Sequence, residues 1–238
     1  MNIQISIIQA SIRGDKEESI PNQDYIDLFE NEDVLIATVS DGLGSSKKSL
    51  DGAKIACKIV IQELQSFQTF SNLQLLNELI IMCWEKEIKR LSDSLSDYRT
   101  TNSFVAVFKK SQKIIVGQLG DGLVSLRIDG LFRYLQSATK DFSNETECLG
   151  SGRNDNFNIA LYEFGHSFDF LITTDGIGDE LEIEKNETLH DYLKNKFKDI
   201  DPSIRNDILK QEIEDFVNEK NNDDKSLIFI WTNKINKI

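Results

Sequence analysis

Three runs of apolar residues in this chain end in the same dipeptide, Asp-Gly, and this repetition restricts the fold more than any other feature. The runs are "VLIATVSDG", "IIVGQLGDG" and "FDFLITTDG", which end at Asp41-Gly42, Asp121-Gly122 and Asp175-Gly176. A fourth apolar run, "SLIFIW", follows an acidic pair that begins with Asp223. Apolar runs of this length are typical of buried β-strands. If these strands share a sheet, their carboxylates converge at one edge, where rigid strand ends hold them in place.

A single Asp-Gly after a strand is most often only a turn, and the chain contains two further examples. We assign Asp51-Gly52 to a helix and Asp129-Gly130 to a hairpin. Repetition at three strand ends favours a metal site, because like charges packed together repel and raise one another's pKa. A divalent cation removes this penalty. Ligands that are all oxygen indicate Mg²⁺ or Mn²⁺ rather than zinc. We also expect the glycine after each acid to let the backbone turn sharply.

The order of the expected elements predicts an α+β fold in one domain that covers residues 1–238. Strands are expected in "IQISIIQAS", in a hairpin of "YIDLF" and "VLIATVS", in four short runs within 103–135, in "NIALYEF", in "FDFLITT" and in "SLIFIWT". Apolar residues at helical spacing predict two helices between Lys47 and Leu95, the second capped by Ser71, and two more over 189–197 and 204–217. Helices grouped between runs of antiparallel strands favour stacked layers over a βαβ alternation.

The charge balance excludes some classes of partner. The 238 residues carry a formal net charge of -13 without a basic patch, which argues against binding to nucleic acid or to an anionic membrane. We find no signal peptide and no apolar run of membrane-spanning length, so we expect a cytoplasmic monomer. Three scattered cysteines, without C-x-x-C spacing, are expected to stay reduced. Residues 136–157 form a long polar stretch, and loops of this length are often functional.

Six segments, in order, resemble the metal-dependent protein phosphatases of type 2C. They are "PNQDY", "VSDGLGSSKKSLDGAKIA", "TTNSFVAVF", "VGQLGDGLVSLR", "FLITTDGIGDEL" and "DDKSLIFIW". The resemblance extends from Ser11 to Trp231, and the Gln before Asp24 and the "GLGSS" form are most similar to the bacterial branch. It implies a four-layer α/β/β/α sandwich, in which a central antiparallel β-sandwich is flanked by helix pairs and two metal ions lie at one end.

The resemblance also implies a role for individual residues. Asp41 would bridge two Mn²⁺ or Mg²⁺ ions, and the Gly42 carbonyl would bind one of them. Asp175 and Asp223 would hold the other ion, and Asp24 would hold metal-bound waters. Asp121, together with Asp175, matches a third and weaker metal position that occurs in many bacterial members. Asp24, Asp41 and Asp175 are therefore the expected catalytic residues.

The implied reaction is hydrolysis of phosphoserine or phosphothreonine in a protein substrate, with a Ser/Thr kinase as the opposing partner. Two divalent ions lower the pKa of a bridging water to near neutral and neutralise the phosphate, and the resulting hydroxide attacks phosphorus in line. This reaction needs no covalent enzyme intermediate. It therefore agrees with a chain that has no nucleophilic Cys motif.

Three positions depart from the family pattern and leave two alternatives open. Gln23 stands where an acid is common, Ser19 where an Arg grips the phosphate, and Leu43 where a His serves as general acid. Arg13 or Lys16 are candidates to replace the missing Arg, and a metal-bound water would protonate the leaving group. One alternative is a weak or inactive member that binds phosphoproteins or a signalling partner. The other is a Ca²⁺-binding structural protein, which ranks last because the EF-hand ligand ladder is absent.

Overall fold

Two five-stranded antiparallel sheets form the centre of the molecule. The computed structural model describes residues 4–135, 146–152, 156–182, 185–217 and 221–233. Sheet 1 has the order β1 (Ile5–Ile12), β10 (Lys225–Thr232), β9 (Phe168–Thr173), β6 (Leu123–Ile128) and β7 (Leu131–Leu135). Sheet 2 has the order β2 (Tyr25–Glu30), β3 (Val34–Ser40), β4 (Asn102–Phe108), β5 (Lys113–Leu119) and β8 (Asn158–Glu163). Most of the expected 136–157 loop lies outside the described residues.

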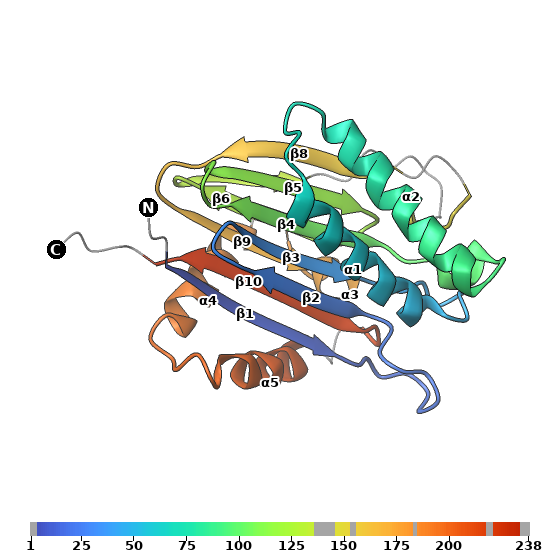
Figure 1. The fold of residues 1–238 in the computed structure, drawn as a ribbon. Coiled ribbons are helices and arrows are strands. Elements are labelled where there is room, and N and C mark those ends of the chain that lie inside the picture. Colours follow the sequence, from blue (N-terminus) through green and yellow to red (C-terminus); the bar gives the residue numbers. More distant parts are fainter. Residues whose placement is uncertain (1–3, 136–145, 153–155, 183–184, 218–220, 234–238) are drawn as a thin grey trace.

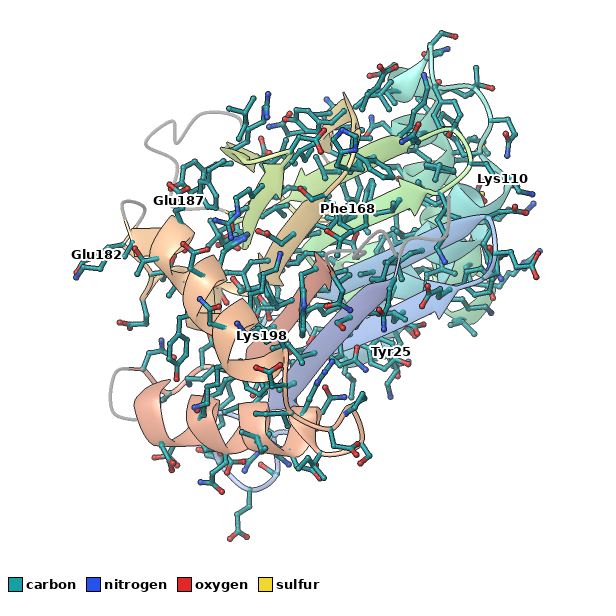
Figure 2. The ribbon with its side chains drawn as sticks, turned by 90° about the vertical axis from the view of Figure 1, so that its left-hand side faces the viewer. Tyr25, Lys110, Phe168, Glu182, Glu187 and Lys198 are labelled. Carbon is teal, nitrogen blue, oxygen red and sulfur yellow. The ribbon has the colours of Figure 1, made fainter. Side chains whose placement is uncertain are left out.

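Helix pairs cover the outer faces of both sheets (Figure 1). Helices α1 (Ser49–Ser66) and α2 (Leu73–Leu91) lie on sheet 2, and α4 (Asn186–Phe197) and α5 (Arg205–Val217) lie on sheet 1. Figure 2 shows the second pair from the side, with Phe168 inside the molecule and Lys110 at its far end. The expected four-layer α/β/β/α sandwich is therefore confirmed. None of the helices in the described ranges is long and apolar enough to cross a membrane.

Strand β3 shows why the central runs are apolar throughout. Val34 and Ile36 face α1 and α2, whereas Leu35, Ala37 and Val39 pack between the sheets. Successive side chains of a strand point to opposite faces, so a strand with a layer on each side needs apolar residues at every position. β10 alternates in the same way between the inner core and the core under α4 and α5.

The expected boundaries of α2 are wrong at both ends. Asn72, not Ser71, caps the first turn, because its side chain accepts a hydrogen bond from the Leu75 N–H. The helix ends at Leu91 because Ser92 adopts an extended conformation, and Leu95 begins the short 3₁₀ helix η1 (Leu95–Tyr98). Apolar spacing continued past the last helical turn and could not reveal this break.

Candidate metal centre

Strand register brings the predicted acids to one end of the sandwich. In sheet 1, Thr173 at the end of β9 is paired with Leu123 at the start of β6 and with Leu227 near the start of β10. Asp121, Asp175 and Asp223 each lie two residues beyond these strand ends. In sheet 2, Tyr25 is paired with Ser40, so Asp24 and Asp41 follow at the same end of the β2–β3 ladder.

Electrostatic interactions show that the two sets of acids meet. Burial, and then the charges of Asp24, Asp223 and Asp121, raise the pKa of Asp41 well above its usual range. Burial, and then the charges of Asp41, Asp121 and Asp223, raise the pKa of Asp175 to about 8. We call Asp24, Asp41, Asp121, Asp175 and Asp223 the carboxylate cluster. It joins one end of sheet 1 to the same end of sheet 2.

Asp24 is the most deeply buried acid of the cluster, with 4% of its surface exposed. Its Oδ2 atom accepts a hydrogen bond of 2.8 Å from the Thr174 hydroxyl, whereas its Oδ1 atom is buried without a partner. The Asp41 carboxyl lies within hydrogen-bond reach of Asp24. Burial is the largest cause that raises the pKa of Asp24 to about 7. An orphaned buried oxygen of this kind is a candidate acceptor for water or for a bound group.

Two threonines before β4 hold the backbone of Asp41. The Thr100 hydroxyl donates to the Asp41 carbonyl at 2.7 Å, and the Thr101 N–H donates to the same oxygen at 2.8 Å. The Asp41 N–H in turn donates to the Thr101 hydroxyl at 3.2 Å. Gly42 is buried beside them, and its N–H donates to the Gln23 carbonyl at 3.2 Å. These bonds fix the position of both residues relative to β4.

Close packing explains why glycine follows Asp41 and Asp175. The positive-φ glycines of the described chain are Gly120, Gly130, Gly150 and Gly152, so Gly42, Gly122 and Gly176 do not adopt the left-handed conformation. A Cβ on Gly176 would lie 2.0 Å from the Asp224 carbonyl oxygen. A Cβ on Gly42 would lie 2.7 Å from the Ser49 backbone and 2.9 Å from the Gln23 carbonyl oxygen. Both glycines therefore let separate segments of the site approach each other.

Asp224 organises the loop that connects β1 to β2, a role that the sequence did not indicate. It is 1% exposed, and its Oδ1 accepts from the Gly14 N–H at 2.8 Å. Its Oδ2 accepts from the Gln23 N–H at 2.7 Å and from the Lys16 Nζ at 3.1 Å. The acidic pair is therefore divided: Asp223 faces the cluster, and Asp224 holds the loop that carries Asp24.

The two cations that were candidates for gripping phosphate are both engaged. The Arg13 guanidinium donates to the carbonyls of Ile20, Lys16 and Glu17, so it closes its own loop. Lys16 forms an ion pair with Asp223, with its Nζ 2.7 Å from Oδ1. Neither side chain is free to act as the expected substitute for an Arg at position 19.

The three departures from the family pattern lie close to this site. Ser19 is exposed on the β1–β2 loop. The Gln23 side chain donates to the Ser49 hydroxyl at 2.6 Å, and the Leu43 N–H donates to the Arg99 carbonyl at 3.1 Å. Asp121 is exposed and accepts a hydrogen bond of 2.8 Å from Thr146. These contacts hold the loops together, and they supply no charge to replace an acid or an Arg.

The donors of the cluster fit a divalent cation in chemistry. All are carboxylate or carbonyl oxygens, burial and mutual repulsion disfavour their ionised forms, and Asp24 keeps an orphaned oxygen. The side chains do not form a ready cage. Within the described residues, no three His, Cys, Asp or Glu side chains are arranged closely enough to hold one ion. An ion would therefore have to draw the acids together.

Thr174 is a second residue that the sequence did not indicate. Its hydroxyl accepts from the Ser226 N–H at 3.0 Å while it donates to Asp24, and so it connects β9, β10 and the start of β2. Two threonines precede Asp175-Gly176 in the sequence, but only the fold shows which of them reaches an acid.

His166 lies in the surface turn between β8 and β9, where its N–H donates to Asp129. Asp129 is at the β6–β7 hairpin, far from the cluster.

Comparisons with known proteins agree with this architecture. The family described as Protein phosphatase 2C matches residues 13–218. Among solved structures, RsbX in complex with magnesium is 14% identical, with a TM-score of 0.63, covering 98% of this chain and 99% of that chain. The S. agalactiae serine/threonine phosphatase is 18% identical, with a TM-score of 0.63 and coverage of 95% and 99%. The catalytic domain of the serine/threonine protein phosphatase PstP, in complex with two manganese ions, is 14% identical, with a TM-score of 0.61 and coverage of 97% and 99%.

None of the curated proteins matches the chain. Identities this low show a shared fold only, whereas the family match extends over most of the sequence, including Asp24, Asp41, Asp121 and Asp175. The order of the six motifs predicted the same relationship. The chain belongs to the protein phosphatase 2C family.

Proposed function

We propose that this protein is a metal-dependent phosphatase that hydrolyses phosphoserine or phosphothreonine in protein substrates. The observation that carries the proposal is the carboxylate cluster, in which acids from both sheets repel one another and raise one another's pKa. Such an arrangement destabilises the metal-free protein, and bound cations would remove this penalty. The family match gives the reaction class, and the cluster supplies the residues for it.

In this proposal, Asp41 and the Gly42 carbonyl hold one Mn²⁺ or Mg²⁺ ion, and Asp41 also contacts a second ion held by Asp175 and Asp223. Asp121 contributes to a third, weaker position. The bound ions supply Lewis-acid activation of water and neutralise phosphate charge. The two manganese ions of PstP and the magnesium of RsbX support this choice of metal.

Asp24 would position a water molecule in the site. Its Oδ2 is fixed by Thr174, and its free Oδ1 faces the site as an acceptor. With one oxygen anchored, the other can orient a water molecule and accept its proton without moving. In the metal-free protein the pKa of Asp24 is raised to about 7, chiefly by burial. Bound cations would lower this pKa, so Asp24 would be ionised at neutral pH and able to accept a proton from water.

We further propose that the 238 residues act as one catalytic domain, as a monomer in the cytoplasm, opposite a Ser/Thr kinase. No disulfide joins Cys57, Cys83 and Cys148, which supports a reducing compartment. A second candidate function is a weak or inactive member that binds phosphoprotein. The observation in its favour is that Arg13 and Lys16, the nearby cations, are both engaged by protein groups.

The test is hydrolysis of para-nitrophenyl phosphate and of a phosphothreonine peptide with Mn²⁺, Mg²⁺, Ca²⁺ or EDTA. Asp175→Asn should lose roughly a hundredfold or more in turnover, because a neutral amide is a poorer ligand than a carboxylate. Asp93→Asn, an exposed acid in the α2–η1 connection, is the matched control and should behave as wild type. Mn²⁺ binding without turnover would favour the phosphoprotein-binding candidate, and no metal binding would reject the phosphatase.

A further inference from the structure

Lys16 occupies an unusual position for a lysine, at the edge of a site that would hold cations. Its Nζ lies 2.7 Å from Asp223 Oδ1 and 3.1 Å from Asp224 Oδ2. Only 20% of its side chain is exposed. Within the described ranges, this is the only ion pair between a basic side chain and an acid of the carboxylate cluster.

The loop that carries Lys16 is built against the acidic pair. The Gly14 N–H donates to Asp224, and Arg13 donates to the Lys16 carbonyl at 2.6 Å. A Cβ on Gly14 would lie 2.2 Å from the Asn222 carbonyl oxygen and 2.4 Å from the Asp223 backbone. The backbone before Lys16 therefore lies directly on the segment that opens β10. This packing fixes the ammonium near Asp223, unlike that of a solvated surface lysine.

The ion pair makes the acids of the cluster unequal. Asp41, Asp121 and Asp175 interact with one another as uncompensated charges, whereas Asp223 already has a cation on one oxygen. A divalent ion that uses the carboxylate of Asp223 must share it with the ammonium or displace it. The ion also meets direct repulsion from a positive charge a few ångströms away.

We propose that Lys16 is a built-in competitor for Asp223, so that the metal position on Asp175 and Asp223 binds more weakly than the position on Asp41. This inference rests on the proposed metal site. It assigns an order of filling to the chain: the Asp41 position loads first, and the Asp223 position loads only when the Lys16 ammonium gives way. Occupancy of the second position then follows the concentration of free Mn²⁺ or Mg²⁺.

The experiment is calorimetric titration of metal-free protein with Mn²⁺, using wild type, Lys16→Met and Lys110→Met. Lys110 is the control, because its Nζ lies 2.5 Å from Asp33 at the opposite end of β3 and both side chains are largely exposed (Figure 2). We expect two steps for wild type. Lys16→Met should bind its weaker ion at least tenfold more tightly, which corresponds to about 1.4 kcal/mol. Lys110→Met should match wild type.

A charge-preserving variant separates charge from shape. Lys16→Arg keeps the cation and should keep the weak second step, and Lys16→Gln should behave as Lys16→Met if the methionine variant fails to fold. Unchanged or weaker Mn²⁺ binding in both neutral variants would overturn the inference while the phosphatase proposal stands. Weaker inhibition by inorganic phosphate with unchanged Mn²⁺ affinity would also overturn it, and would make Lys16 a phosphate-binding residue. If neither wild type nor the neutral variants bind Mn²⁺, the metal site and this inference both fail.

Discussion

Sheet 1 carries the buried acid Asp169 on one face and part of the carboxylate cluster at one end, and the charges of these two regions are neutralised to different extents. On the face under α4, Asp169 is 3% exposed and accepts from His190 Nδ1 at 2.6 Å and from Arg127 Nε at 3.2 Å. The other His190 nitrogen is 2.8 Å from the Ser125 hydroxyl. We call these four residues the Asp169 network. At the end of the sheet, the carboxylate cluster gathers several acids, and among the described residues Lys16 is the only basic side chain that forms an ion pair with one of them.

A buried acid whose charge is neutralised by basic partners has a structural role, whereas an acid without such a partner is a candidate metal ligand. The hydrogen-bonded series Ser125–His190–Asp169 matches a hydrolytic triad, but Ser125 and His190 are both fully buried, and Phe132 and Phe229 pack edge-on against the imidazole. No substrate can reach the hydroxyl, so the network serves to join α4 to β6 and β9. Most acids of the cluster lack a neutralising partner instead, which costs stability in the metal-free protein and would favour the proposed metal binding.

The largest expected effect is a change in the free energy of unfolding that has opposite signs in the two regions. Asp169→Asn should lower the free energy of unfolding by about 3 kcal/mol, because it leaves the buried guanidinium of Arg127 without its buried partner. Asp41→Asn, measured in EDTA, should raise that free energy by about 1 kcal/mol, because it removes one of several repelling charges. Urea unfolding monitored by tryptophan fluorescence measures both.

Asp191→Asn is the matched control for Asp169→Asn. Asp191 accepts from the same Arg127 at 2.7 Å, but its side chain is 56% exposed, so its loss should cost less than about 1 kcal/mol. Equal costs for the two variants would mean that burial does not strengthen the Asp169 pair. A destabilised Asp41→Asn protein in EDTA would show that the cluster is not under electrostatic strain.

The next effect is a pH dependence that metal should abolish. Asp175 and Asp24 have pKa values raised to about 8 and about 7, so the folded metal-free protein binds protons that the unfolded chain releases near pH 4. Their contribution to stability is therefore complete below pH 4 and is lost as pH rises through 7 and 8.

Between pH 6 and pH 8 the metal-free protein should lose about 1–2 kcal/mol, after allowance for the partial exposure of Asp175. Urea titrations in EDTA at several pH values measure this slope, and saturating Mn²⁺ should flatten or reverse it. A metal-free stability that is constant from pH 6 to pH 8 would contradict the raised pKa values. The Asp175→Asn variant should have a smaller slope than wild type.

The sequence predicted the strand-end acids because each of them directly precedes or follows a continuous apolar run. Asp24 and Asp41 meet through one hairpin, and Thr173 pairs with two neighbouring strands. It could not predict contacts that depend on distant segments, such as Lys16 on Asp223 or Thr174 on Asp24. The Asp169 network likewise joins β6, β9 and α4, which pack together only in the folded chain. The pattern therefore located the candidate ligands, and tertiary packing decided which of their charges are neutralised.

The smallest expected effects come from one hydroxyl in each region. Ser125→Ala removes the partner of His190 and should cost about 1 kcal/mol of stability, with phosphatase turnover unchanged.

Thr174→Val removes the donor that anchors Asp24 Oδ2, so both oxygens of a buried carboxylate lose their fixed orientation. We expect this variant to lose about tenfold in kcat, which corresponds to about 1.4 kcal/mol of transition-state stabilisation.

A structural role alone would make Thr174→Val resemble Ser125→Ala, because each variant removes one buried hydroxyl. Thr174→Ser restores the hydroxyl and should restore kcat, whereas a purely steric effect of the methyl group would leave Thr174→Ser impaired. The pH–rate profile adds a readout that packing does not move. Without its donor, the ionised form of Asp24 is less favoured, so the acidic limb of the profile, which reports deprotonation of this base, should shift to higher pH in Thr174→Val and not in Ser125→Ala. An unshifted profile with reduced kcat would assign Thr174 to packing and leave Asp24 without an anchor that matters for catalysis.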